Sequence, residues 1–138
     1  MSRERENHNK QLIGQAFGDW AAGTGGPYAL LAEDVTWTIV GNTPASRTYH
    51  SRDEFLGQVI GPFNARLATP LVPALHALYA DGGTVIAYFS ASATAQDGQP
   101  YQNTYTWYLD LDGDRITNAI AFFDSIEFTD FWNRVTPT

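Results

Sequence analysis

Three Asp-Gly pairs divide the second half of the chain and constrain its fold more than any other feature. They stand at Asp81-Gly82, Asp97-Gly98 and Asp112-Gly113. Such pairs favour the tight turns of β-hairpins, because glycine adopts a positive φ without steric cost. The segments between them are rich in β-branched and aromatic residues, which is typical of strands. The four expected strands cover residues 71–80, 84–96, 101–111 and 115–124. We therefore expect an antiparallel meander in this half.

In the first half, apolar residues recur mainly at helical spacing. Residues 9–22 predict an amphipathic helix that the following glycines end. Pro27 opens a second, short helix through residue 31, and residues 35–40 alternate as a single strand. A third helix begins at Ser51, whose side chain can accept a hydrogen bond from the amide of Glu54, while Glu54 reaches back to the amide of Ser51. We expect Pro62 to kink or end this helix.

This order of elements predicts an α+β fold, because no repeated alternation of strand and helix is present to build a parallel sheet. We expect a cone-shaped, curved antiparallel sheet wrapped around the N-terminal helices, with an aromatic-lined hollow at one end. The 138 residues predict a single domain over 1–138. Within it, the polar stretch 1–7 is expected to be a mobile leader.

Composition excludes several classes of function. The chain has no cysteine, so disulfides, thiolate metal sites and cysteine nucleophiles are absent. Its formal net charge of −7 argues against a nucleic-acid partner, which requires clustered cations. The three histidines are scattered, and we expect neither a metal nor a cofactor. No apolar run approaches the length of a membrane span and no secretory signal is visible, so we expect no membrane partner and a cytoplasmic location.

The 19 aromatic rings suggest a hydrophobic ligand site. Alternation places Tyr105 and Trp107 on one face of their strand and Trp37 on one face of residues 35–40. The expected ligand-binding residues are Trp37, Ile39, Phe63, His76, Asn103, Tyr105, Trp107 and Phe122. The alternative is that these side chains only pack against the helices. The opposite sheet face is polar but hardly charged, which favours association with a second copy as a homodimer.

Asp124 is the candidate catalytic residue. It follows the apolar run 119–123, and apolar surroundings would raise its pKa toward the range that suits proton transfer at neutral pH. His76 is a candidate partner for it. The alternative for Asp124 is that it caps the short helix expected after residue 124. The alternative for His76 is a hydrogen-bonded residue at the edge of the sheet.

Several motifs in this order resemble one known superfamily. They are the run Leu31-Ala32-Glu33-Asp34-Val35-Thr36-Trp37, the glycine-rich stop after the first helix, the turn Asp112-Gly113-Asp114-Arg115-Ile116 and the strand end Phe122-Phe123-Asp124. Together they are similar to the nuclear transport factor 2-like superfamily over residues 7–134. Within it the chain most resembles the SnoaL-like group, which includes polyketide cyclases, ketosteroid isomerases and limonene-epoxide hydrolases.

The resemblance implies that the catalytic side chains of two well-known enzyme types are absent here. The three catalytic positions of ketosteroid isomerases fall at Ala16 or Phe17, at Ile39, and at Thr106 or Trp107, and none of these side chains can replace the family's groups. The five positions of the epoxide hydrolases fall at Trp37, Ile39, Ala91, Ala93 and Asp124, and only Asp124 matches. What remains is the polyketide-cyclase pattern, in which a single carboxylate acts as general acid and base.

Two functions follow from this reading. The first is a cofactor-independent enzyme that cyclises, isomerises or dehydrates a hydrophobic cyclic or polyketide-like substrate through Asp124. The second is a non-catalytic ligand-binding or dimerisation module of the same fold, in which Asp124 is structural.

Overall fold

The computed structural model describes residues 2–137 and contains one sheet with most of its helical segments on one face and the C-terminal helix at one end. The helical segments are α1 (Ser2–Ala22), the 3-10 turn η1 (Pro27–Leu30), α2 (Arg52–Phe55), the π-helix η2 (Leu56–Ile60), α3 (Gly61–Ala65) and α4 (Ser125–Arg134). The strands are β1 (Leu31–Ile39), β2 (Thr48–Tyr49), β3 (Val72–Asp81), β4 (Thr84–Thr94), β5 (Pro100–Asp112) and β6 (Arg115–Phe123). The expected α+β class is confirmed.

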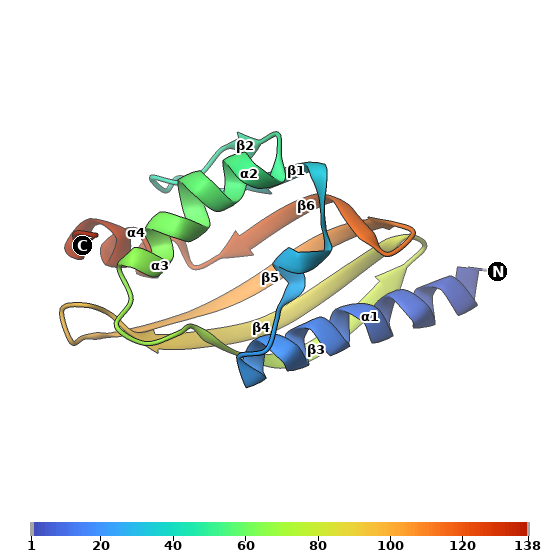
Figure 1. Ribbon diagram of the computed structural model, residues 1–138, viewed down its shortest axis with the longest axis horizontal. Helices are drawn as coiled ribbons and strands as arrows, with labels where there is room; N and C mark the ends of the chain where they lie inside the picture. The colour runs from blue at the N-terminus through green and yellow to red at the C-terminus, as the bar shows by residue number, and fades with distance from the viewer. Residues whose placement is uncertain (1, 138) are drawn as a thin grey trace.

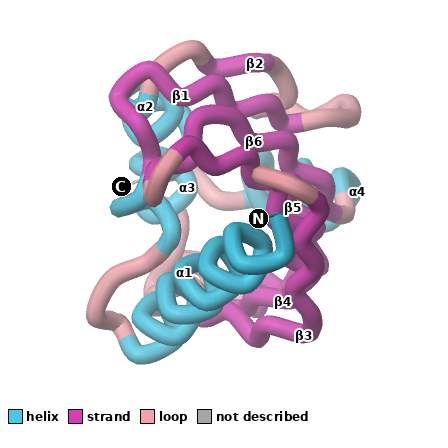
Figure 2. The backbone as a smooth tube through the Cα atoms, turned by 90° about the vertical axis from the view of Figure 1, so that its right-hand side faces the viewer, coloured by secondary structure: helices cyan, strands magenta, loops and turns pink. Residues whose placement is uncertain are grey.

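The sheet is curved and open, and its strand order is β2-β1-β6-β5-β4-β3. Strands β3 to β6 form the predicted antiparallel meander. The sheet as a whole is mixed, however, because β1 runs parallel to β6. The chain between these two strands includes β2, the helical segment from α2 to α3 and strands β3 to β5, which is long enough for β1 to lie parallel to β6. Figures 1 and 2 show α1 and the α2–α3 segment on the same side of the sheet.

The three predicted hairpin turns are present. Gly82, Gly98 and Gly113 all have positive φ, between 60° and 83°. Their strands begin and end within two residues of the expected limits. The agreement arises because the position of a hairpin turn depends on nearby residues only: a glycine with positive φ and the alternating side chains on either side of it.

Helix α1 begins at Ser2, seven residues before its expected start. Residues 2–7, expected to be a mobile leader, therefore form its first turns, and residue 1 lies outside the described residues. Two contacts hold this end against the hairpin turns. The Gly82 amide donates to Glu6 at 2.7 Å, and His8 Nε2 lies 2.8 Å from Asp114 Oδ1. Both partners are distant in sequence, so a local pattern does not reveal them.

The third helix starts as predicted, since the Glu54 amide donates to Ser51 Oγ at 3.0 Å. Glu54 Oε1 accepts from the amide of His50, one residue before the expected donor, at 3.1 Å. Pro62 does not end the helix. A π-helical turn, η2, precedes it, and the helix continues as α3 to Ala65.

Within residues 2–137, one buried polar side chain lacks hydrogen-bond partners. Asn9 of α1 is buried, and neither its Oδ1 nor its Nδ2 has a hydrogen-bond partner in the structure. A buried amide without partners loses its hydration and gains nothing in return.

We expect Asn9→Leu to raise the free energy of unfolding by about 1 kcal/mol, because it removes this unsatisfied amide. Chemical denaturation measures the change. Asn7→Leu is the matched control, since Asn7 is exposed on the same helix and reports the helix-propensity effect alone. Equal changes in the two variants would contradict the prediction.

Candidate functional site

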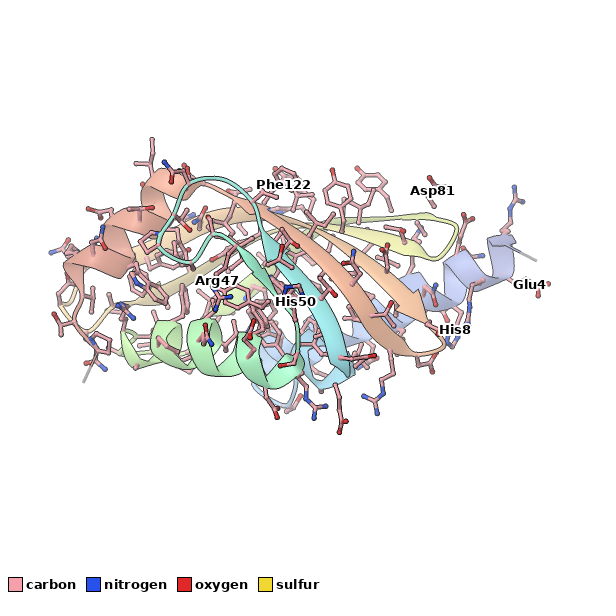
Figure 3. All side chains as sticks on the ribbon, turned by 90° about the horizontal axis from the view of Figure 1, so that it is seen from above. Glu4, His8, Arg47, His50, Asp81 and Phe122 are labelled. Carbon is pink, nitrogen blue, oxygen red and sulfur yellow. The ribbon has the colours of Figure 1, made fainter. Side chains whose placement is uncertain are left out.

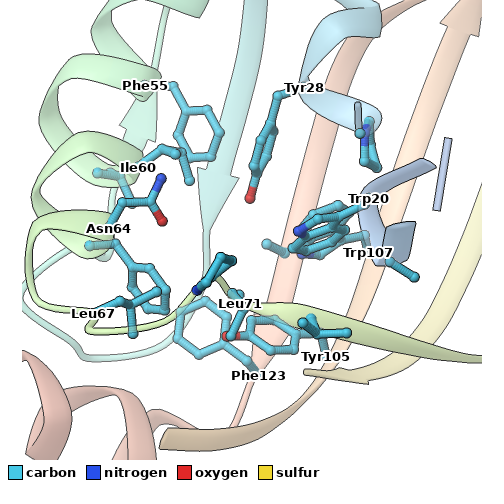
Figure 4. A pocket seen from close by; sticks show the side chains of 18 of the residues that line it. Trp20, Tyr28, Phe55, Ile60, Asn64, Leu67, Leu71, Tyr105, Trp107 and Phe123 are labelled. Carbon is cyan, nitrogen blue, oxygen red and sulfur yellow. The ribbon is translucent and has the colours of Figure 1, made fainter. Parts of the chain in front are cut away.

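A cavity of about 730 Å³ lies between the α2–α3 segment, the end of α1 and the helix-covered face of the sheet. Rings and aliphatic side chains from nearly every element form its walls (Figure 4). The lining residues are Trp20–Gly23, Gly25–Tyr28, Trp37, Ile39, Phe55, Val59, Ile60, Phe63, Asn64, Leu67–Val72, Tyr105, Trp107, Ala121, Phe123 and Phe128. The cavity is thus mostly apolar, as small-molecule sites usually are.

Trp107 of β5 lies at the centre of the aromatic wall. Its ring stacks on Trp20 of α1, with centroids 5.9 Å apart and planes 12° apart. Its other side meets Trp37 of β1 edge to face at 5.1 Å. Trp37 in turn stacks on Phe55 of α2 at 4.3 Å. These contacts fix the wall, because aromatic pairs prefer offset-stacked and edge-to-face arrangements.

The polar groups of the cavity are uncharged. They are the hydroxyls of Tyr28, Tyr105 and Thr69, the amide of Asn64 and the indole N–H groups. Among residues 2–137, no Asp, Glu, His, Lys or Arg lines the cavity. The site can therefore donate hydrogen bonds, but no carboxylate or imidazole is placed there to move a proton.

A hydrogen-bonded network lies behind one wall. The hydroxyls of Tyr101 and Tyr105 are 2.7 Å apart, and Asn103 Nδ2 donates to Tyr101 at 2.9 Å. Burial raises the pKa of Tyr101 to about 12 and raises the pKa of Tyr105 well above its ordinary value. Both phenols are thus neutral hydrogen-bonding groups at physiological pH.

Five of the predicted ligand-binding residues line the cavity together. They are Trp37, Ile39, Phe63, Tyr105 and Trp107. Asn103 is buried but does not line it. Its amide is fully used: Nδ2 donates to the backbone oxygen of Asp124 at 3.0 Å, and Oδ1 accepts from the amides of Asp124 and Thr104. Asn103 therefore fixes the end of β6 to β5 and is not available to a ligand.

The prediction that Phe122 faces the hollow is wrong. Its side chain is 47% exposed on the sheet face opposite the helices (Figure 3), and Phe123 lines the cavity in its place. The cause is a register shift between Asp110 and Leu111 in the pairing of β5 with β6. One extra residue on a strand moves every later side chain to the other face. Without it, Phe122 would pair with the inward-facing Tyr105.

His76 also lies away from the cavity. It stands at the register shift of β3, between the pairs that Leu75 and Ala77 make with β4. Its exposed ring approaches Ser90 Oγ at 2.8 Å and packs on Tyr88, with centroids 5.0 Å apart. The alternative of a hydrogen-bonded edge residue describes this position, and His76 is not near Asp124.

Asp124 is the N-cap of α4. Its Oδ1 accepts hydrogen bonds from the amides of Ile126 and Glu127 at 3.0 and 3.2 Å. The residue borders a small polar groove with Gln102, Thr104 and Glu127, but it does not line the aromatic cavity. The capping role weighed from the sequence is therefore present, and the carboxylate is not placed on the cavity wall.

Sequence reasoning missed several lining residues. Trp20 and Tyr28 come from the end of α1 and from η1, and Leu71 comes from the segment before β3. Trp20 ends the apolar stripe of the first helix, which predicts that it is covered but not that it borders a cavity. Tyr28 carries no pattern that separates it from other turn residues.

Comparisons with known proteins show the family and the fold. The family model for the SnoaL-like domain matches residues 17–119, which is most of the chain. The chain belongs to the SnoaL-like domain family. A search of curated proteins finds no match.

Solved structures place the SnoaL-like chain in the nuclear transport factor 2-like fold. An NTF2-like protein from Burkholderia thailandensis has a TM-score of 0.73 at 21% identity, covering 89% of this chain and 95% of its own. A Jannaschia sp. protein named as a SnoaL-like polyketide cyclase has a TM-score of 0.71 at 10% identity, covering 91% of each chain. TerC, co-crystallised with polyporic acid, has a TM-score of 0.71 at 14% identity, covering 91% of this chain and 98% of its own.

Most of the positions that the resemblance assigns to catalytic residues are apolar in this SnoaL-like protein, and the polar exceptions are Thr106 and Asp124. Ile39 and Trp107 line the cavity as hydrophobic groups, and Ala91 is a buried residue of β4. At Ile39 and Trp107, therefore, the cavity carries no side chain that could transfer a proton at neutral pH.

We expect the free energy of unfolding to fall as the pH rises from about 10 toward 12. Unfolded tyrosines ionise near pH 10, whereas Tyr101 keeps its proton until about pH 12, so the folded state binds more protons in this window. The contribution is fully present below pH 10. Urea denaturation at pH 9, 10 and 11 measures the fall, and Tyr101→Phe should lessen it. A stability that does not change over this range would contradict the prediction.

Proposed function

We propose that this protein binds an uncharged, hydrophobic cyclic small molecule in the aromatic cavity. The observation that carries the proposal is a cavity of about 730 Å³ whose lining side chains, among residues 2–137, include rings and uncharged donors but no charged group. Transfer of an uncharged ring into such a cavity is favourable at roughly 25 cal/mol per Å² of apolar surface buried. A charged ligand would lose its hydration without gaining a counter-charge.

TerC supports the proposal, because a protein of this fold accommodates a small molecule. The competing proposal is an enzyme that cyclises, isomerises or dehydrates such a molecule through Asp124. The position of this carboxylate at the N-cap of α4 favours binding over proton transfer. The cytoplasmic location expected from the sequence stays a prediction. No helix in residues 2–137 is long and apolar enough to cross a membrane.

The uncharged fluorophore N-phenyl-1-naphthylamine tests the cavity. We expect one fluorophore molecule to bind per chain, with a blue shift of its emission. Ala68→Trp should weaken this binding at least about tenfold, because the larger side chain fills the mouth of the cavity. Ala68 is exposed at the rim, and its backbone amide is held by Thr94, so a larger side chain there need not disturb the core. Ala74→Trp, at an exposed position outside the lining, is the matched control. Equal weakening by both substitutions, or no binding at all, would overturn the proposal.

Asp124→Asn separates binding from acid–base chemistry. Asparagine caps helices about as well as aspartate, so we expect an unchanged fold and unchanged fluorophore binding. Asp124→Ala should lose about 1 kcal/mol of unfolding free energy through loss of the cap. If a substrate is found whose turnover falls more than a hundredfold in Asp124→Asn, the enzymatic proposal replaces the binding one.

We infer that the protein forms a homodimer through the uncovered face of the sheet. Two rows of side chains run across the strands on this face. Direct partners in the register form the rows Tyr79-Ile86-Tyr108-Ile120 and Tyr88-Thr106-Phe122. Tyr79, Tyr88, Tyr108 and Phe122 are between 37% and 59% exposed. The sequence predicts a polar, hardly charged face, but these largely aromatic rows make its centre more apolar than expected. Exposed apolar patches are typical of association surfaces.

Light scattering at micromolar concentration should give twice the chain mass of 15.2 kDa. Phe122→Lys should shift the protein toward the monomer, because it places a charge in the centre of the patch. Ile126→Lys is the control, since Ile126 is 80% exposed but lies on α4. A parent mass of one chain would contradict the dimer.

A further inference from the structure

Tyr28 differs from the other enclosed tyrosines in that its hydroxyl has no partner. Tyr49 donates to the Ala45 oxygen at 2.7 Å, and Tyr101 and Tyr105 bond to each other. For Tyr28, no hydrogen bond to any residue of 2–137 exists. Figure 4 shows its hydroxyl aimed into the cavity, between the side that carries Phe55 and Ile60 and the side that carries Trp20 and Trp107.

Four rings hold Tyr28 in place. Its ring centroid lies 6.1 Å from Trp20, 6.0 Å from Trp37, 5.8 Å from Phe55 and 5.9 Å from Trp107. Tyr28 belongs to η1, and the ring of Pro27 fixes the φ angle of the residue directly before it. The position of the oxygen is therefore set, and only rotation of the O–H bond remains. A donor fixed in advance loses little entropy when it binds.

Tyr28 is a neutral phenol at physiological pH. Burial raises its pKa further above the ordinary value. The neighbouring indole groups donate and cannot accept. A ligand that meets this wall finds the Tyr28 hydroxyl and the indole N–H groups as donors. A ligand with no hydrogen-bonding group leaves the Tyr28 hydroxyl dry and unpaired. Such a loss costs more than the net value of the hydrogen bond itself.

We propose that Tyr28 is the specificity-determining residue of the cavity and selects uncharged ring compounds that carry a carbonyl oxygen, which accepts its hydrogen bond. This rests on the proposed ligand-binding function and adds the class of ligand. Ring hydrocarbons of the same shape bind more weakly because they leave the Tyr28 hydroxyl without a hydrogen-bond partner. Carboxylates are rejected because, in the described part of the chain, no cation lines the cavity to replace their hydration.

Three naphthalenes of nearly equal size test this. They are 2-acetylnaphthalene, 2-isopropenylnaphthalene, in which CH₂ replaces the carbonyl oxygen, and 2-naphthoate. Quenching of tryptophan fluorescence and calorimetry give each Kd. For the parent protein we expect the ketone to bind roughly tenfold more tightly than the alkene, and the naphthoate at least a hundredfold more weakly than the ketone.

Tyr28→Phe removes one oxygen and keeps the ring. It should weaken ketone binding roughly tenfold and leave alkene binding unchanged or tighter, so that the preference disappears. Tyr79→Phe makes the same chemical change on the outer face and should preserve the preference. Its side chain is 59% exposed and lies outside the cavity.

The outcomes separate this inference from the proposed function. If ketone and alkene bind equally to the parent, or if Tyr28→Phe weakens both alike, the role of Tyr28 is overturned while ligand binding stands. Tight binding of naphthoate also overturns the selection of uncharged ligands. If neither uncharged naphthalene nor N-phenyl-1-naphthylamine binds, the proposed function itself fails.

Discussion

The packing of one ring, Trp107, joins the two halves of this protein. It contacts Phe17 and Trp20 from α1, Tyr28 from η1 and Trp37 from β1, and Phe89 and Tyr105 from the sheet. The N-terminal elements make few backbone hydrogen bonds to the meander, apart from the pairing of β1 with β6. Side-chain packing on Trp107 therefore decides where these elements lie, and with them the shape of the cavity that they enclose.

The architecture follows from local signals, which is why it could be predicted. Turn glycines, the cap at Ser51 and strand alternation each act within a few residues. The faces of Phe122 and His76 could not be predicted in this way. Each depends on a single register shift, in β5–β6 and in β3–β4, and no nearby residue type announces either. Tyr105 and Trp107, which precede the shift in β5, have the predicted orientation.

The candidate site shows the same division. An aromatic hollow was predictable from the number of rings and the alternation of β5. The role of Asp124 was not, because a carboxylate after an apolar strand fits both a buried acid and a helix cap. Only the position of the Ile126 and Glu127 amides distinguishes the two. The proposed role of Tyr28 could not be predicted either, because it depends on a hydroxyl whose lack of a hydrogen-bond partner is visible only in the three-dimensional structure.

The π-helical turn η2 has a consequence for the wall opposite the sheet. In a regular α-helix, residues four apart drift by about 40° per step, so a stripe at Phe55, Val59, Phe63 and Leu67 would wind away from the cavity. A π turn is wider and holds more residues, which cancels part of this drift. All four side chains consequently border the same space. Deleting one residue within Leu56–Ile60 would restore a regular helix and turn the later part of this wall toward solvent.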